Sequence, residues 1–170
     1  IRDDDPVLVI ENLRAYTLKG EVPTDPEHVV EIGRAAIPRS GSDLTIVSHG
    51  YATTRALAVA DRLAESHEVE IEVVDLRSLR PLDVETVAAS VARTHRVLCV
   101  EEGWPSYGVT AELAARIQRA CFDDLDAPVE RVGMAEVPLP YAKNLETAAL
   151  PNEDRVAAAA LATLGLGPAA

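Results

Sequence analysis

The chain has 170 residues, of which 48% are hydrophobic and only 4% aromatic, and its formal net charge is −12. This length suits one domain with a full core plus an appendage, and it is too short for two ordinary domains. The acidic balance argues against nucleic acid as a partner, because that binding depends on clustered lysine and arginine, and it favours a basic partner.

The sequence carries no signal for membrane insertion or export. No apolar run approaches the roughly 20 residues that a membrane-spanning helix needs, and the acidic start IRDDDP is unlike a secretory signal. The two cysteines, Cys99 and Cys121, match neither a metal-binding spacing nor a redox pair, and each lies in an apolar segment where a free cysteine packs as a small hydrophobe. We therefore expect a soluble, cytoplasmic protein without a membrane partner.

The N-terminal part of the chain is predicted to be mostly irregular. Residues 7–10 have a short strand pattern, but one strand of this length needs neighbours, so the segment looks like part of a preceding domain. Residues 15–41 mix prolines, glycines and charges, which predicts a linker. We divide the chain into a remnant of a preceding domain at 1–14, this linker, and a compact domain at 42–170.

From Ser42 onward, strand patterns alternate with helix patterns. The predicted strands are residues 44–48, 70–75, 97–100 and 129–132, and the predicted helices begin after Gly50, Asp83, Ser106 and Asn152. Asp83 and Asn152 are expected to be helix N-caps. The second strand is expected near an edge, with one face exposed at its start, and residues 133–151 are expected to be an extended connection. This order predicts an α/β fold, a three-layer sandwich with a mainly parallel sheet.

The stretch 97–108, VLCVEEGWPSYG, is the centre of this pattern. It reads as a buried strand, a turn and the start of a helix, and such turns lie at the carboxyl ends of parallel strands, where ligands and partners bind. Trp104, between glycine and proline, is interpreted as an anchor at a subunit interface. Glu101 and Glu102 are adjacent at a strand end and should point in different directions, so we interpret them as a helix cap or as partners of an arginine, not as a catalytic pair.

The sequence predicts no catalytic residue, no cofactor-binding residue and no metal ligand in this chain. His49 follows the first strand and is the most enzyme-like residue, but no carboxylate stands near it in the sequence to orient it, which favours a structural or interface role. The short signatures for nucleotides, acyl transfer and zinc hydrolysis are absent. The run Asp123, Asp124 and Asp126 is either a solvated helix end or a docking patch for a basic module.

Several segments together resemble the beta subunits of thiamine-diphosphate-dependent 2-oxo acid dehydrogenases. They are IRDDDPVLVIEN, VVDLRSLRPLD, VEEGWPSYG and LDAPVERV, followed by VPLPYAKNLE and LPN. The PYAK segment at 140–143 and the LPN segment at 150–152 are more similar to the pyruvate dehydrogenase type than to the branched-chain type, and acetoin dehydrogenase is also close. The resemblance covers almost the whole chain. It implies the end of a pyrimidine-binding domain, a linker and a transketolase-like C-terminal domain.

The resemblance also implies a function. In that family, two alpha and two beta subunits decarboxylate a 2-oxo acid on thiamine diphosphate, with magnesium, and transfer the acyl group to a lipoyl arm. The cofactor residues lie in the alpha subunit and in the N-terminal domain of the beta subunit, so this chain alone is expected to bind no cofactor and to be inactive. The C-terminal domain pairs with the second beta subunit and docks the basic peripheral subunit-binding domain of the dihydrolipoyl acyltransferase.

The docking residue that the resemblance implies is Asp126 in the LDAP motif, and Asp124 lies beside it. The family also docks through the C-terminal carboxylate of the beta subunit, but this chain continues past residue 166 to Ala170, so we do not carry that role over. The residues also leave open a different class of function. In that alternative, a stand-alone α/β module binds a small anion at the turns formed by His49-Gly50 and Gly103.

Overall fold

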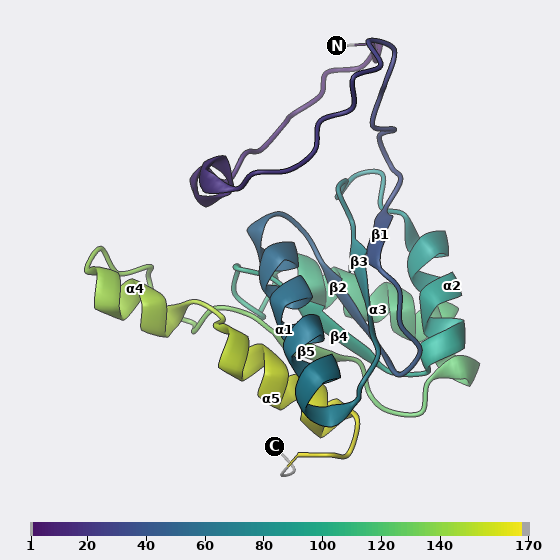
Figure 1. The fold of residues 1–170 in the computed structure, drawn as a ribbon, viewed down its shortest axis with the longest axis vertical. Coiled ribbons are helices and arrows are strands. Elements are labelled where there is room, and N and C mark those ends of the chain that lie inside the picture. Colours follow the sequence, from purple (N-terminus) through teal and green to yellow (C-terminus); the bar gives the residue numbers. More distant parts are fainter. Residues whose placement is uncertain (1, 168–170) are drawn as a thin grey trace.

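The computed structural model describes residues 2–167, and its centre is a five-stranded sheet with helices on both faces (Figure 1). This arrangement confirms the predicted three-layer α/β sandwich. The strand order is β1-β3-β2-β4-β5, and only β1 runs antiparallel to its neighbour. The strands are β1 (Ala36–Arg39), β2 (Leu44–Ser48), β3 (Ile71–Asp75), β4 (Val97–Val100) and β5 (Glu130–Val132).

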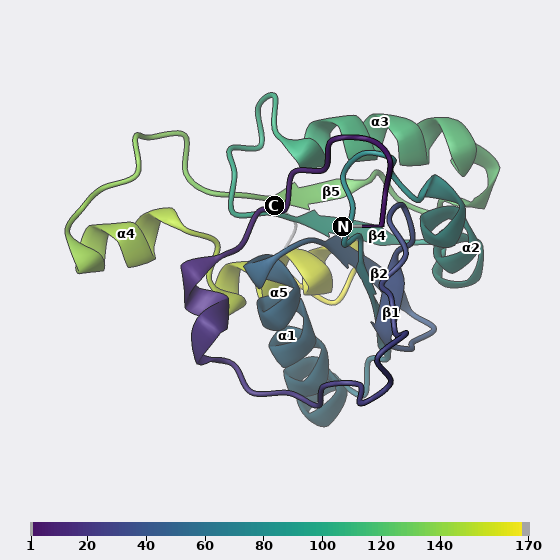
Figure 2. The same cartoon turned by 90° about the horizontal axis from the view of Figure 1, so that it is seen from above.

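Two helices cover each face of the sheet, and a further helix projects from its carboxyl end (Figure 2). The helices are α1 (Tyr51–His67), α2 (Val84–Thr94), α3 (Val109–Ala120), α4 (Lys143–Ala149) and α5 (Glu153–Thr163). Two short 3-10 helices, η1 (Leu13–Thr17) and η2 (Phe122–Asp124), complete the described elements. In Figure 2, α1 and α5 lie below the sheet, whereas α3 lies above it and α2 to its right.

The core is divided by the sheet because successive side chains of a strand point to opposite faces. Ile46 and Leu98 face α1 and α5, whereas Val47 and Cys99 face α2 and α3, and all four are fully buried. Apolar residues on both faces explain why these strands read as continuous hydrophobic runs, as expected for parallel strands covered on both sides. The predicted bounds of β2 and β4 are confirmed, and predicted 129–132 is one residue longer than β5.

Both predicted helix caps are present. The Asp83 carboxylate accepts a hydrogen bond from Thr86 N at 3.0 Å, and the Asn152 side chain accepts one from Arg155 N at 2.9 Å. Asp83 also accepts from Ala35 N at 2.9 Å, which ties α2 to the segment before β1. Burial opposes ionisation of Asp83, but these hydrogen bonds and the nearby Arg34 outweigh it, so the pKa of Asp83 is lowered.

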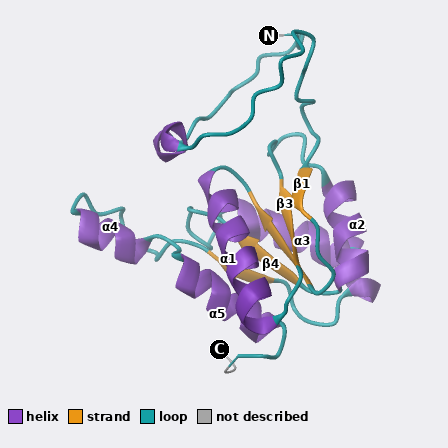
Figure 3. Cartoon of the chain, viewed as in Figure 1, coloured by secondary structure: helices purple, strands orange, loops and turns teal. Residues whose placement is uncertain are grey.

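The N-terminal part agrees with the prediction in one place and differs from it in another. Residues 7–10 form no strand, and their side chains are exposed, because this part of the chain offers them no neighbouring strand (Figure 3). Within the predicted linker, the chain forms β1, which we did not expect because β1 contains Pro38. β1 pairs only with β3, and an edge strand tolerates proline because one side of its backbone needs no sheet partner.

Two further expectations were wrong. The start of β3 does not expose one face, because Glu72 is buried and forms an ion pair with Arg93 of α2. The proposed extended connection at 133–151 contains α4, which lies in the proline-free stretch between Pro140 and Pro151.

The division of the chain at 14 and 41 stays a prediction, and the C-terminal carboxylate at Ala170 lies outside the described residues. Within residues 2–167, no helix has the length and hydropathy needed to cross a membrane.

Candidate functional sites at the two ends of the sheet

The carboxyl ends of β2 and β4 form the topological switch point of the sheet. β2 lies between β3 and β4, so the chain passes to one side of β2 and then to the other. In open α/β sheets, ligands bind in the crevice at such a point. Because Ser48 pairs with Val100, the residues that follow, His49 and Glu101, both leave the sheet at this rim. The rim therefore contains the turns that the sequence singled out.

Glu101 is a structural residue of this rim. Its side chain lies at the end of β4 and is 2% exposed, and its carboxylate accepts hydrogen bonds from Val109 N at 3.1 Å and Thr110 N at 3.0 Å. The Thr110 hydroxyl donates a third. Because Gly108 provides no side-chain cap for α3, Glu101 satisfies the free N–H groups at the start of that helix. The helix-cap interpretation of Glu101 is confirmed.

Glu102 points away from Glu101 and binds arginines. Its carboxylate lies 3.3 Å from the Arg55 guanidinium and 4.0 Å from that of Arg14, and it accepts a hydrogen bond from Asn12 Nδ2 at 2.9 Å. Arg55 belongs to α1, and its side chain is only 14% exposed. Arg14 belongs to η1 and also binds Glu146 at 2.7 Å. This network joins η1 to the rim and confirms the interpretation of Glu102 as an arginine partner.

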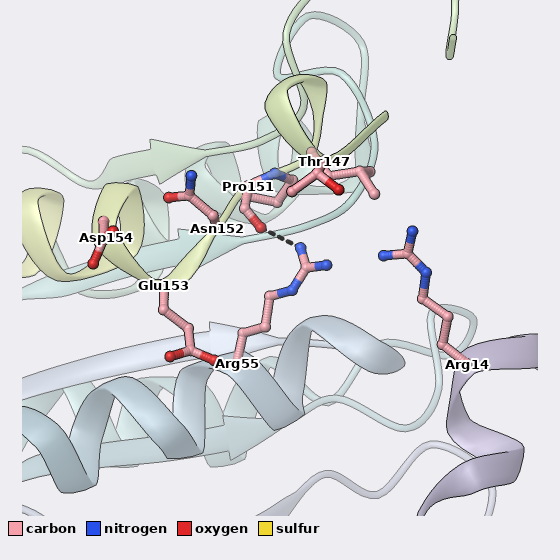
Figure 4. Close-up of a pocket in the computed structure, with 8 residues that line it drawn as sticks. Arg14, Arg55, Thr147, Pro151, Asn152, Glu153 and Asp154 are labelled. Atoms are coloured by element: carbon pink, nitrogen blue, oxygen red, sulfur yellow. Dashed lines mark hydrogen bonds between the residues drawn. The ribbon is translucent and has the colours of Figure 1, made fainter. Parts of the chain in front are cut away.

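A cavity of about 310 Å³ lies beside this network, between η1, α1 and the start of α5 (Figure 4). Arg14 and Arg55 line it from two sides, with Thr147 and residues 150–154 on the others. Figure 4 shows Arg55 pointing at Pro151, whose carbonyl oxygen accepts a hydrogen bond from the Arg55 guanidinium. Neither the His49-Gly50 turn nor Gly103 lines the cavity. Since Glu102 and Glu146 neutralise both arginines, the cavity does not favour a small anion.

The other reactive side chains near the rim show no catalytic arrangement. His49 Nε2 is buried without a hydrogen-bond partner among residues 2–167, and Ser48 donates its hydroxyl to Thr53 at 3.0 Å, not to His49. Burial raises the pKa of the Cys99 thiol to about 12, with the Arg131 charge opposing the shift, so the thiolate is absent at neutral pH. Burial also raises the pKa of the Cys121 thiol, which lies at the end of α3 that is away from the rim.

Trp104 lies on the exposed part of the same rim. Its side chain is 46% exposed, and its Nε1 donates to Val137 O at 3.2 Å. The turn after β4 and the connection after β5 are joined further by Met134 N, which donates to Gly103 O at 2.8 Å. The two segments expose five large hydrophobic side chains, which we call the aromatic rim: Trp104, Tyr107, Val137, Leu139 and Tyr141.

Asp124 and Asp126 lie at the opposite end of the sheet from Trp104. Asp126 N donates to His95 O at 2.9 Å, and His95 Nδ1 donates to Asp124 O at 2.7 Å. His95 precedes β4, whereas Trp104 follows it, so the strand separates the aspartates from the tryptophan. The three residues predicted to bind partners therefore form two surfaces. The second, the acidic turn, consists of residues 122–126.

Sequence reasoning missed the two arginines that organise the rim. Arg55 lies one position before the apolar helical stripe of α1, and Arg14 lies in a segment that was interpreted as irregular. A signal for Arg55 was available, because a residue in the first turns of the helix after β2 must lie at the carboxyl end of the sheet. No local pattern marks Arg14, because its partners are 88 and 132 residues away in the sequence.

The family comparison agrees with this architecture. Residues 33–156 match the model of the transketolase C-terminal domain. The chain belongs to the transketolase C-terminal domain family. This membership confirms the predicted transketolase C-terminal-like fold. A split-gene transketolase solved as an inactive beta4 tetramer shares the fold at 28% identity with a TM-score of 0.67, covering 85% of this chain and 45% of that one.

This transketolase C-terminal domain is similar in sequence to curated subunits of one enzyme component. The chain is 45% identical over 169 residues to the mitochondrial pyruvate dehydrogenase E1 component subunit beta of Drosophila melanogaster, covering 97% of this chain and 46% of the relative. It is 47% identical over 162 residues to subunit beta-1 of Arabidopsis thaliana, covering 93% and 44%. The resemblance to pyruvate dehydrogenase beta subunits is thus confirmed. The chain spans less than half the length of these relatives.

The resemblance implies a magnesium site in the intact enzyme, and the side chains of this domain can be compared with the ligands that such a site needs. In residues 2–167, no group of three or more histidine, cysteine, aspartate or glutamate side chains converges as metal ligands would. The carboxylates of the rim are already bound to α3 and to arginines. These residues do not fit a magnesium site, and we derive no chemical step through one.

Proposed function

We propose that this chain is the C-terminal assembly and docking domain of the beta subunit of a pyruvate-dehydrogenase-type decarboxylating component. The intact component would decarboxylate a 2-oxo acid with thiamine diphosphate and magnesium and would pass the acyl group to a lipoyl arm. The domain itself would supply contacts to the alpha subunit, to a second beta subunit and to the acyltransferase. The similarity to pyruvate dehydrogenase E1 beta subunits over 97% of this chain supports the assignment.

The aromatic rim is our proposed surface for subunit assembly. Trp104, Tyr107 and Tyr141 are large side chains with 46%, 103% and 104% exposure, and the hydrogen bond from Trp104 Nε1 to Val137 O fixes the tryptophan. Preorganised aromatic side chains are enriched at protein interfaces because they bury a large area at a small entropic cost. Assembly would use this surface without the charge repulsion that a net charge of −12 imposes elsewhere.

The acidic turn is our proposed surface for docking, and its unpaired charge is the observation that carries this proposal. The Asp123 and Asp124 carboxylates have no ion-pair partner within the described part of the chain, and Asp126 lies 3.9 Å from Arg96 with 60% of its side chain exposed. The Glu101 and Glu102 carboxylates of the rim are bound internally, whereas those of Asp123 and Asp124 are free to bind a lysine or arginine, and that of Asp126 has only the Arg96 contact within residues 2–167. The peripheral subunit-binding domain of the acyltransferase is the basic partner that we propose.

Calorimetric titration tests this proposal. The intact alpha–beta assembly containing this chain is titrated with the isolated peripheral subunit-binding domain at low and at physiological salt. We expect saturable binding that weakens with salt, because exposed charges are screened. Asp126→Asn should weaken it roughly tenfold, since it replaces a charge-assisted hydrogen bond by a neutral one.

The matched control is Glu65→Gln, which removes an exposed carboxylate from α1 on the other face of the sheet. It should leave the affinity unchanged. Absence of saturable binding to the wild-type assembly would contradict the docking role. Equal affinities for wild type and Asp126→Asn would instead remove Asp126 from the docking surface while leaving the assembly role in place.

The exact substrate and the location belong to this proposal as well. We assign pyruvate in preference to a branched-chain 2-oxo acid or acetoin, because the relatives described above are pyruvate dehydrogenase subunits. Turnover of each substrate by the reconstituted assembly tests that choice.

We keep the cytoplasm as the proposed location, as for a bacterial protein, because a relative of 45% identity comes from Rhizobium meliloti.

A further inference from the structure

The acidic turn holds an exposed aromatic side chain at its centre. Phe122 is the only phenylalanine of the chain, it is 68% exposed, and it begins η2. Its neighbour Cys121 is 2% exposed, and Leu125 packs against the same core between α2, α3 and the sheet. The chain therefore buries Cys121 before Phe122, partly buries Leu125 after it, and leaves the larger Phe122 side chain in solvent.

Backbone contacts hold Phe122 in that position. Asp124 N donates to Cys121 O at 2.9 Å, which closes the turn around Phe122. The turn is fixed to the body by His95, which donates to Asp124 O and accepts from Asp126 N. An aromatic side chain on a fixed backbone loses little entropy when a partner covers it, and such residues contribute much of the affinity at protein interfaces.

Three carboxylates follow Phe122 closely in the sequence. Asp123 and Asp124 follow it directly, Asp126 stands four positions later, and all three belong to the same short turn. A partner that covers Phe122 must therefore bring positive charge to the edge of the contact. Phosphate backbones would be repelled, which excludes nucleic acid as the ligand that stacks on the ring.

We propose that Phe122 is the apolar anchor of the acidic turn and that it inserts into an apolar depression, flanked by lysine or arginine, on the basic docking module. This inference rests on the proposed docking function and adds the residue that would supply its apolar part. The ring and the carboxylates then have separate roles. The ring sets how long the complex lives, and the carboxylates set how fast it forms and how strongly salt weakens it.

Titration of variants of the intact assembly with the isolated peripheral subunit-binding domain separates these roles. Phe122→Ala is expected to weaken binding roughly tenfold or more at both salt concentrations, with an unchanged salt dependence. Asp126→Asn is expected to reduce the salt dependence. Phe122→Leu, which keeps a large apolar side chain, should weaken binding less than Phe122→Ala. Tyr16→Ala is the matched control, because Tyr16 is a 65% exposed aromatic in the other 3-10 helix, and it should bind as the wild type does.

The outcomes distinguish this inference from the proposed function. If the wild-type assembly fails to bind the module, the docking function itself is overturned. If Asp126→Asn weakens binding while Phe122→Ala and Phe122→Leu bind as the wild type does, docking stands and the anchor role of Phe122 is overturned. Sedimentation of each variant is measured in parallel. If the Phe122→Ala assembly sediments as smaller species because subunits dissociate, the inference is also overturned, since the ring would then belong to a contact between subunits.

Discussion

The two ends of the sheet use the same chemical group in opposite ways. At the carboxyl end, Glu101 is buried and its carboxylate accepts three hydrogen bonds from α3, and Glu102 binds two arginines. At the amino end, Asp123 and Asp124 are paired with no cation within residues 2–167. A carboxylate in the first environment stabilises the fold, because removing it leaves buried donors unsatisfied. A carboxylate in the second contributes little to the fold and is available to a partner.

This contrast changes how the switch point of the sheet should be interpreted. By analogy with other open α/β sheets, the switch point at the carboxyl ends of β2 and β4 is expected to be a ligand site. Here the carboxylates of Glu101 and Glu102 are already bound within the chain, whereas Asp123 and Asp124 at the far end have no ion-pair partner within residues 2–167. Four substitutions test whether the carboxyl end is structural and the acidic turn is not.

The largest effect is expected at Glu101. Glu101→Ala should lower the free energy of unfolding by about 3 kcal/mol, because it leaves two backbone N–H groups and the Thr110 hydroxyl without an acceptor at a buried position. Chemical denaturation measures the change. Glu112→Ala, at an exposed position of the same helix, should cost less than about 0.5 kcal/mol. Equal losses in the two variants would show that Glu101 does not hold α3 to the rim.

A somewhat smaller loss is expected at Gly108. A Cβ atom at this position would overlap the carbonyl oxygen of Trp104 and the carboxylate of Glu101, so Gly108→Ala should destabilise the fold by roughly 1–3 kcal/mol. Gly20→Ala is the matched control, since a Cβ atom there meets nothing within 4 Å. The difference between the two midpoints in urea measures the effect. A neutral Gly108→Ala would mean that the turn is free to move.

Asp83 allows a test by pH. Asp83→Asn should cost about 1 kcal/mol at pH 7, because it weakens the cap of α2. The lowered pKa of Asp83 in the folded chain means that this stabilisation is present above the ordinary carboxyl pKa and is lost as the pH falls through the lower, folded value. The stability difference between wild type and variant should therefore shrink from pH 5 to pH 2. A difference that is constant over this range would contradict the assignment.

The smallest effect on stability is expected at the acidic turn. Asp124→Asn should change the free energy of unfolding by less than about 0.5 kcal/mol. The direction should be neutral or slightly stabilising, because a negative charge just after the C-terminus of α3 opposes the helix dipole. Thermal unfolding at low salt measures it. A large loss of stability would show that Asp124 is a structural carboxylate, and the carboxylates at the two ends of the sheet would then not differ in role.

Local sequence patterns were sufficient for most of the secondary structure. Continuous apolar runs located β2 and β4, helical spacing located α1, α2 and α3, and the oxygen-bearing side chains of Asp83 and Asn152 marked two helix starts. These features depend on interactions within a few residues, so the order of residues determines them. The alternation of strands and helices likewise determined the α/β fold and its mainly parallel sheet.

The same patterns could not locate elements whose stability comes from distant partners. β1 exists because β3 offers it an edge, and Glu72 is buried because Arg93 of α2 reaches it. The placement of the candidate surfaces is also tertiary. Trp104 and Asp126 are 22 residues apart in the sequence, yet the pairing of β4 with β5 puts them at opposite ends of the sheet.

Residue order was therefore enough to predict which segments are strands and helices, and that Glu101 and Glu102 would diverge at a strand end. Which carboxylates are bound inside the chain and which remain free could be seen only in the folded chain. That outcome depends on arginines 47 and 88 residues away from Glu102, at positions 55 and 14, and on a buried helix start beside Glu101. Burial and pairing are properties of the folded chain, and they separate a structural carboxylate from one that can bind a partner.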